Sequence, residues 1–404
     1  MVIKKYIKFL ESTKQEQDMW DIIPESVKDL HKLFQASGKK LYLVGGSVRD
    51  FLTNDKPKDF DLATDALPDE VLDIVDGKYR TNLQGKAFGV VVVYTKEIPE
   101  GMEIATFRED ISKGRNPEVK LGVTIEDDVK RRDITYNALF YDLDKREIID
   151  LTGGKSDLES GITRMVGEPI ERFDEDSLRI LRAFRFASRY EHPLHKDTER
   201  AIEKRKQLEN IDPDTGEMKR ISQERVWEEM TKAWKQAKDY RYYLNFFTKF
   251  DMWDQVFPGS DINTELVDSS NFAVVISNLF KNESTSGLDT KLVQSYKMDS
   301  CSDATKVDNL VSKIIFLIDF LRFDADKVFE TFKKKQQCAI DDATILEWLD
   351  VNNITDDRFI KFTEYKPSVS AQDLMSKGFK GAELGREIKR LEIEKFKNML
   401  WVEL

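Results

Sequence analysis

The stretch "LYLVGGSVRD" (Leu41–Asp50) decides the fold that we expect for the first part of the chain. Its apolar residues predict a buried β-strand, which ends at Gly45 and Gly46, where the pattern becomes that of a helix. Glycine lets the backbone approach an anion closely, and the start of a helix offers free N–H groups. The same pattern is also typical of a purely structural turn. By itself the stretch therefore predicts a strand–turn–helix unit and leaves a phosphate site open.

A pair of aspartates follows at short range, in "KPKDFDLAT" (residues 56–64). Asp59 and Asp61 are two residues apart, and on a β-strand such residues point to the same face. Two carboxylates on one face can hold divalent cations close together, as phosphoryl transfer requires. The other Asp-x-Asp triplets of the chain lie in turn-like contexts. This pair differs because it follows the strand and the Gly-Gly turn.

The remaining periodicity divides the chain into two kinds of sequence. Up to residue 154 we expect one α/β domain, with a helix at 24–37, strands at 88–95 and 102–109, and a hairpin at 138–154 that turns at Asp144–Lys145. From about residue 168 the spacing is helical, notably in 174–190 and 222–237. Residues 258–310 are rich in Ser, Asn, Asp and Thr, and we expect long loops with short helices there.

Composition limits the possible partners. The chain has 404 residues and a net charge of −11, which argues against a general polyanion binder and requires any nucleic-acid contact to come from a local basic patch. The most apolar run, "VSKIIFLIDFLRF" (311–323), is interrupted by Lys313 and Asp319, so no membrane span is expected. Two cysteines, Cys301 and Cys338, fit a reducing compartment. We therefore expect a cytoplasmic protein.

Arginines recur at helical spacing in "ERFDEDSLRILRAFRF" (171–186) and just beyond it. On a helix, Arg182, Arg185 and Arg189 share one face, with Arg179 at its edge. Apolar residues lie roughly opposite and are expected in the core: Ile180, Leu181, Phe184 and Ala187. The arginine face is either a salt-bridged solvent face or an anion site.

These motifs, in this order, resemble a known family. The Gly-Gly turn and the Asp-x-Asp pair resemble the nucleotidyltransferase superfamily typified by DNA polymerase β. The wider series resembles class II CCA-adding enzymes (tRNA nucleotidyltransferases) and the related bacterial poly(A) polymerases, densely from about residue 41 to 235. The motifs that carry it include "LVGGSVRDFL", "KDFDLATDALPDEV", "RRDITYNAL", "IIDLTGGKSDLESGITRMVGEP", "RFDEDSLRILRAFRF" and "ISQERVWEEM".

The resemblance implies an α+β fold. A polymerase β-like nucleotidyltransferase head with a mixed β-sheet is followed by all-α neck, body and tail domains. The implied bounds are 1–154 for the catalytic head, 155–240 for the neck that recognises the nucleotide base, 241–350 for the body and 351–404 for a tail that contacts tRNA. Residues 258–310 match no segment of the family that we can name, and are either an insertion or a diverged part of the body.

The resemblance also implies residue roles. Asp59 and Asp61 would bind two Mg²⁺ ions. Gly45, Gly46 and Arg49 would bind the phosphates of the nucleotide, and Arg132 and Asp133 would bind phosphate and the ribose 2′-hydroxyl. Asp176 and Arg179 would bind the edge of the base. Arg182 and Arg185 would hold phosphates or brace Asp176 and Arg179. Glu109 is our candidate for a further catalytic carboxylate, with a surface charge at a strand end as the alternative. Residues Lys113 to Pro117 would form a flexible loop beside the site.

The implied activity is template-independent addition of C, C and A to the 3′ end of tRNA from CTP and ATP, by a monomer or homodimer. A carboxylate beside an arginine can pair with cytosine or adenine, whose amino groups donate, whereas uracil and guanine present a carbonyl there. The alternatives are a poly(A) polymerase, a partial CC- or A-adding enzyme, or a non-catalytic RNA-binding protein. The acidic chain favours recognition of tRNA shape over generic RNA binding.

Overall fold

The structure is a computed structural model that describes residues 19–57, 59–112, 118–212, 215–298 and 310–401. The chain divides into two compact units. The first, here the N-terminal unit, comprises Met1–Ile221 with Gln236–Lys238, and the second, the C-terminal unit, comprises Ser222–Lys235 with Asp239–Leu404. The finer division into head, neck, body and tail stays a prediction.

A seven-stranded mixed sheet forms the centre of the first part of the N-terminal unit, in the order β3-β4-β5-β2-β1-β8-β9. Only β2 and β5 pair in parallel, and the other neighbours are antiparallel. The strands are β1 (Leu41–Val44), β2 (Leu62–Thr64), β3 (Arg80–Asn82), β4 (Val90–Tyr94), β5 (Met102–Thr106), β8 (Phe140–Asp142) and β9 (Glu147–Ile149).

The position of each strand in the sheet explains its sequence pattern. All four residues of β1 are buried because β1 lies inside the sheet, between β2 and β8. In β4 burial alternates, with Val91 and Val93 inside, as expected for a strand with one covered face. The expected strands at 88–95 and 102–109 and the hairpin after 138 are thus confirmed, with a separate short strand at the end of the second.

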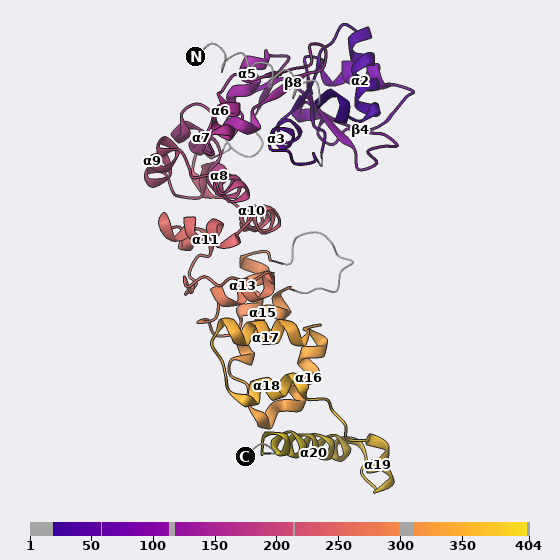
Figure 1. Cartoon of the computed structure of the whole chain (residues 1–404), viewed down its shortest axis with the longest axis vertical. Helices are drawn as coiled ribbons and strands as arrows, with labels where there is room; N and C mark the ends of the chain where they lie inside the picture. Colours follow the sequence, from indigo (N-terminus) through magenta and orange to yellow (C-terminus); the bar gives the residue numbers. More distant parts are fainter. Residues whose placement is uncertain (1–18, 58, 113–117, 213–214, 299–309, 402–404) are drawn as a thin grey trace, which may run out of the picture. The chain divides into compact units, whose positions relative to one another are not determined.

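Helices and turns surround this sheet, as the indigo to magenta part of Figure 1 shows. The helix α2 packs against β1, and α4 packs against β4. The helical elements of the N-terminal unit are α2 (Glu25–Ala36), α3 (Gly46–Leu52), α4 (Pro68–Val75), η1 (Lys86–Phe88), α5 (Ile125–Lys130), η2 (Thr135–Asn137), α6 (Gly154–Glu159), α7 (Pro169–Glu175), α8 (Leu178–Tyr190) and α9 (Lys196–Lys204).

One glycine allows the helix α6 to approach η2 closely. A Cβ atom on Gly154, at the start of α6, would lie 2.2 Å from the carbonyl oxygen of Thr135 in η2. The carboxylate of Asp150 accepts the N–H groups of Gly154 and Lys155 at 2.9 and 3.0 Å, which holds this end of α6 in place. Only glycine therefore permits α6 to pack against η2.

Two further pairs of strands lie outside the main sheet: β6 (Arg108–Asp110) with β7 (Val119–Leu121), and β10 (Glu209–Ile211) with β11 (Met218–Arg220). The expected α+β architecture, with a mixed-sheet head followed by helices, is confirmed. The expectation that the neck is entirely α-helical is wrong in one detail, because β10 and β11 form a hairpin within residues 155–240. These strands have three residues each and lack the apolar alternation by which strands are recognised.

All elements of regular secondary structure in the described part of the C-terminal unit are helical, and from α13 to α20 they follow the orange to yellow part of Figure 1. Its elements are α10 (Gln223–Gln236), α11 (Tyr240–Lys249), α12 (Trp253–Val256), α13 (Phe272–Leu279), α14 (Leu288–Thr290), the π-helical turn η3 (Lys291–Ser295), α15 (Leu310–Phe320), η4 (Ala325–Lys327), α16 (Val328–Gln337), α17 (Asp342–Val351), α18 (Asp357–Glu364), α19 (Ala371–Ser376) and α20 (Gly381–Trp401). Among the described helices, none combines the length and the apolar character needed to cross a bilayer.

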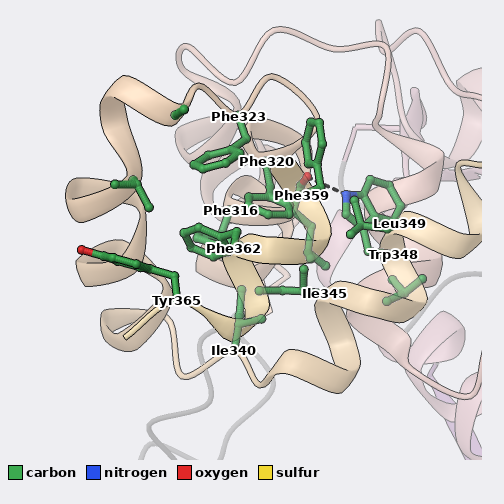
Figure 2. Close-up of a cluster of buried hydrophobic side chains, with 14 of the residues drawn as sticks. Phe316, Phe320, Phe323, Ile340, Ile345, Trp348, Leu349, Phe359, Phe362 and Tyr365 are labelled. Carbon is green, nitrogen blue, oxygen red and sulfur yellow. Dashed lines mark hydrogen bonds between the residues drawn. The ribbon is translucent and has the colours of Figure 1, made fainter. Parts of the chain in front are cut away.

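Aromatic side chains form much of the core of this unit, and Figure 2 shows one group of them. Phe320 packs against Phe316, Phe323 and Phe362 at ring-centroid distances of 5.0–5.6 Å. The indole N–H of Trp348 donates to the carbonyl oxygen of Leu317 at 2.6 Å, so the buried ring leaves no polar atom unsatisfied. Aromatic residues at helical spacing therefore serve as core in this unit.

Candidate active site

The Gly-Gly turn joins β1 to α3 and packs against η2. Gly45 has a φ angle of +62°, which favours glycine, and its N–H donates to the carbonyl oxygen of Leu139 at 3.0 Å. A Cβ atom on Gly45 would lie 3.4 Å from the carbonyl oxygen of Asn137. The strand–turn–helix unit predicted from Leu41–Asp50 is thus confirmed. The turn is fixed by backbone contacts on its inner side.

The two aspartates lie immediately before β2. The N–H of Val44 donates to the carbonyl oxygen of Asp61 at 3.0 Å, so pairing with β1 continues one residue beyond the strand itself. Asp59 and Asp61 are both exposed and close enough to repel each other electrostatically. The expected strand begins at Leu62 rather than at the aspartates, but the carboxylates still lie together beside the end of β1.

Burial and two neighbouring carboxylates act on Asp61. Loss of hydration inside the surrounding protein and repulsion from Glu103 and Asp59 raise the pKa of Asp61 to about 6, and Arg132 opposes this shift. Asp61 remains accessible to solvent, so the missing hydration is partial. A carboxylate that is crowded by two others, with one arginine in opposition, is a favourable place for a cation.

Glu103, rather than Glu109, is the third carboxylate that the structure brings to this pair. Glu103 lies on β5 and directly precedes Ile104, which is the parallel partner of Leu62 in β2. Glu109 lies on β6, opposite Lys120, in the separate two-stranded sheet. The catalytic role expected for Glu109 therefore stays a prediction, and Glu103 is a carboxylate that the prediction did not include. The alternation in "MEIATFRE" could have shown that Glu103 points away from the core, but only the strand order shows that β5 neighbours β2.

The Arg-Arg-Asp motif is held by a buried carboxylate that sequence reasoning missed. Asp128 is 1% exposed and forms ion pairs with Arg131 and Arg132 at 2.8 and 2.9 Å. Burial alone would raise the pKa of Asp128, but the two arginines outweigh it and lower the pKa. Asp128 therefore fixes both arginine side chains. Arg131 and Arg132 follow Asp128 by three and four residues, and this spacing at the end of α5 could have predicted the ion pairs.

Asp133 connects the head to α8. Nε of Arg182 donates to its carboxylate at 2.6 Å, and the amide of Asn137 donates to it at 3.3 Å. Burial opposes ionisation of Asp133, but Arg182 and the N–H of Ile134 outweigh it and hold its pKa well below the usual range. Asp133 is thus an ionised acceptor at neutral pH.

Arg49 lies in a second buried network. It donates to Asp50 at 2.7 and 2.9 Å and to the side-chain oxygen of Asn137 at 2.5 Å. Arg189 and Tyr190 of α8 also donate to Asp50, at 2.9 and 3.2 Å. Asp50 and Asn137 were not predicted from the sequence. Because Arg49 is already held by two partners, the geometry favours a bracing role at least as much as direct phosphate contact.

Asp176 and Arg179 lie together at the start of α8, where Asp176 accepts the N–H of Leu178 at 3.2 Å. Arg179 donates to Glu175 at 2.5 Å and to the carbonyl oxygen of Arg131 at 2.9 Å, which links α7 and α8 to the Arg-Arg-Asp motif. Arg185, by contrast, is buried and donates to Gln236 at 2.8 Å. Of the two roles expected for Arg185, its burial favours bracing.

The apolar face of α8 is as predicted, since Ile180, Leu181, Phe184 and Ala187 are all fully buried.

Among the residues that the structure describes, no group of three or more His, Cys, Asp or Glu side chains is arranged to hold a metal ion by itself. The expected loop from Lys113 to Pro117 lies outside the described residues.

A mixed sheet with a Gly-Gly turn after one strand and an aspartate pair before the next defines a nucleotidyltransferase of the polymerase β type. Residues 41–164 match the family model of the poly A polymerase head domain. A CCA-adding enzyme of Lactobacillus helveticus is 30% identical over 392 residues, which cover 92% of both chains. The chain belongs to the family of CCA-adding enzymes and bacterial poly(A) polymerases, which use divalent metal ions.

Two more comparisons define the extent of the likeness. Poly(A) polymerase I of Haemophilus influenzae is 32% identical over 249 residues, and the chain spans only 52% of that enzyme's length. The solved structure of a Thermotoga maritima CCA-adding enzyme complexed with tRNA has a TM-score of 0.65 at 19% identity, and the match covers 96% of this chain and 94% of that one. The common fold thus extends through both units.

Proposed function

We propose that this chain adds C, C and A to the 3′ end of tRNA without a nucleic-acid template, using CTP and ATP and releasing pyrophosphate. The observation that carries the proposal is the aspartate pair beside the Gly-Gly turn, in a chain that a CCA-adding enzyme matches over 92% of its length. The acceptor would be the terminal 3′-hydroxyl of tRNA, which displaces pyrophosphate from the α-phosphate of the nucleotide.

Magnesium is the proposed metal, and Asp59 and Asp61 would hold it together with oxygens of the triphosphate. The residues fit such an ion because carboxylate oxygens are its usual ligands and because, besides burial, repulsion from Glu103 and Asp59 raises the pKa of Asp61. Glu103 would add to this field. When bound, Mg²⁺ supplies acidification of the attacking hydroxyl and neutralisation of the charge that develops on the phosphates.

The protein groups around the pair would bind and orient the nucleotide. Gly45 and Gly46 allow the triphosphate to approach the backbone. Asp133, which is ionised and held by Arg182, can accept a hydrogen bond from the ribose 2′-hydroxyl and so favour ribonucleotides. Asp176 and Arg179 offer an acceptor and a donor to the base edge, a combination that suits cytosine and adenine.

The turn between α19 and α20 is the proposed contact with the tRNA backbone. Gly378 and Gly381 have φ angles of +100° and +50°, and no atom lies near enough to restrict a ligand there. Lys377, Lys380 and Arg386 are exposed around the turn. Cationic side chains beside a bare glycine backbone suit an RNA phosphate.

A cytoplasmic place of action remains a prediction that rests on this substrate.

A poly(A) polymerase is the second candidate, because Poly(A) polymerase I of Haemophilus influenzae matches 58% of this chain. One assay separates the two. A tRNA that lacks CCA is incubated with Mg²⁺ and with each nucleoside triphosphate singly and together, and the products are sized and sequenced. We expect two residues with CTP alone and the sequence CCA with CTP and ATP. Long adenosine tails would favour the second candidate, and absence of any addition would contradict both.

The role of the aspartate pair is tested with Asp59→Ala. We expect this variant to lose activity by at least about a hundredfold while its affinity for tRNA, measured by filter binding, stays close to that of the unaltered protein. Asp69→Ala is the matched control, since Asp69 is an exposed acid that pairs with Lys86 and has no part in the proposed site. If Asp59→Ala keeps its activity, the metal assignment is wrong.

A further inference from the structure

The hairpin of β10 and β11 reaches the proposed base-reading residue through one side chain, Asn210. Nδ2 of Asn210 donates to Oδ1 of Asp176 at 2.9 Å, and Oδ1 of Asn210 accepts the N–H of Ser177 at 2.8 Å. The amide therefore bonds both the carboxylate of Asp176 and the backbone of the next residue. Both bonds fall at the turn that leads into α8.

Asn210 is itself held in place by the stem of the hairpin. Arg205 donates to Asp174 at 3.1 Å, to the carbonyl oxygen of Gln207 at 2.5 Å and to that of Glu209 at 2.7 Å. Leu208 is fully buried, and its carbonyl oxygen accepts the N–H of Ile221 at 2.8 Å. These bonds hold the hairpin against α7 and close its base. The backbone that carries the side chain of Asn210 is therefore fixed in position.

We propose that Asn210 is a positioning residue for the carboxylate of Asp176, so that the β10–β11 hairpin takes part in the choice of nucleotide. The inference rests on the proposed function, in which Asp176 reads the base edge. It assigns a functional part to a segment whose sequence, "LENIDPDTGEMKR" (208–220), carries no catalytic motif.

The physical reason lies in the freedom of an aspartate side chain. The torsion that turns a carboxylate about its own axis is broad, so neighbouring donors must fix its plane. Asn210 and the N–H of Leu178 both donate to Oδ1 of Asp176, at 2.9 and 3.2 Å. Hydrogen bonds to an ionised acceptor are stronger than neutral ones. Without the amide the plane is set less sharply, and an acceptor with a loose orientation distinguishes an amino group from a carbonyl group less well.

The test compares Asn210→Ala with the unaltered protein in single-nucleotide addition to tRNA that lacks CCA. We expect the ratio of kcat/KM for CTP to that for UTP to fall about tenfold or more, with most of the change in KM for CTP and little in kcat. Calorimetric binding of CTP and UTP without tRNA gives the same ratio independently of chemistry. Lys219→Met is the control, because Lys219 pairs with Asp212 on the same hairpin but does not touch Asp176.

A second variant supplies a readout that a purely structural role would not produce. Asn210→Asp places a carboxylate opposite Asp176, and the two can share a hydrogen bond only when one of them is protonated. We therefore expect its discrimination between CTP and UTP to recover as the pH is lowered from 8 to 5.5, which is a trend that the unaltered protein does not follow.

The outcomes separate the two proposals. Equal losses for all four nucleotides in Asn210→Ala, or no change in the CTP to UTP ratio of either variant, would overturn the positioning role while CCA addition stands. If the unaltered protein binds CTP in preference to UTP but adds no nucleotide, the proposed activity is wrong, and the binding ratio still decides the role of Asn210.

Discussion

At the scale of single residues, the active site is a set of charges held by other charges. Asp128 holds Arg131 and Arg132, Arg182 holds Asp133, and Asp50 holds Arg49. Asp61 differs, because burial and repulsion from Glu103 and Asp59 act against its charge more than Arg132 favours it. Removing one partner of a buried pair leaves a buried charge uncompensated, so these networks fix geometry at the cost of tolerance to substitution.

The raised pKa of Asp61 predicts how metal-free protein responds to pH. The folded-state pKa of about 6 exceeds the ordinary value of 3.8, so the folded state binds more protons between these values and its stability falls as the pH rises through this window. In the Asp61→Asn variant this side chain stays neutral, so the variant does not lose stability over this pH window. At pH 7.5 we expect this variant to be more stable by about 1 kcal/mol, a figure reduced for the solvent access of the side chain.

The measurement is thermal unfolding in EDTA at pH 4 and at pH 7.5, followed by the same scans with Mg²⁺ and CTP. At pH 4 the two proteins should agree, and at pH 7.5 the asparagine variant should melt higher without metal. Metal and nucleotide should then stabilise only the unaltered protein, and Asp61→Asn should be inactive. Equal stability of the two proteins at pH 7.5 would mean that the fold does not raise the pKa of Asp61.

At the scale of secondary-structure elements, one buried acid fixes the connection between α18 and α20. Glu392 on α20 is 1% exposed. Its carboxylate accepts the N–H groups of Ser368 and Val369 at 2.7 and 2.5 Å and the hydroxyl of Tyr365 at 2.9 Å. Burial and this carboxylate raise the pKa of Tyr365, which keeps its hydroxyl a donor. The extended segment after α18 is thus held by a side chain instead of a strand partner.

We expect Glu392→Ala to destabilise the C-terminal unit by about 2–4 kcal/mol, because two backbone N–H groups and a buried hydroxyl lose their acceptor. Glu392→Gln keeps one oxygen acceptor and should cost less. Urea unfolding followed by circular dichroism measures both. Glu394→Ala is the control on the same helix, since Glu394 is exposed and pairs only at the surface with Arg390. Similar losses for residues 392 and 394 would contradict a specific role of the buried carboxylate.

At the scale of the whole molecule, the chain consists of two compact units with separate cores. The proposed nucleotide site, from Gly45 to Arg185, lies within the N-terminal unit. The aromatic core around Phe320 and Trp348 lies within the C-terminal unit. Nucleotide binding should therefore stabilise one unit directly and the other only through any coupling between them.

Tryptophan fluorescence can measure this, because Trp20 is the one tryptophan in the N-terminal part of the sequence, and the other five follow residue 222. With Mg²⁺ and CTP at a hundred times the dissociation constant, we expect the transition of the N-terminal unit, followed by circular dichroism, to gain about 2.7 kcal/mol. The transition seen by fluorescence should move little. A single transition that shifts equally by both probes would show that the units unfold together.

Much of the fold could be predicted from local sequence. The strand at Leu41–Val44, the turn at Gly45 and the buried face of α8 follow from apolar periodicity and glycine, which act over a few residues. The β10–β11 hairpin could not be predicted in this way, because its strands have three residues and are stabilised by contacts with α7 and the start of α8. The position of Glu103 was missed for a related reason, since it depends on which strands become neighbours.

The sequence by itself determined the chemical groups of this protein: an aspartate pair, a glycine turn and a helix with arginines on one side. Each of these features is encoded by residues that lie close together in the sequence. The tertiary structure alone decided which of these groups meet. It brought Glu103 to Asp61 through a parallel strand pair, and it brought Asn210, which follows Ser177 by 33 residues, to Asp176 through a hairpin. Contacts of this kind depend on strand order and on packing between distant segments, and no local pattern of residues specifies them.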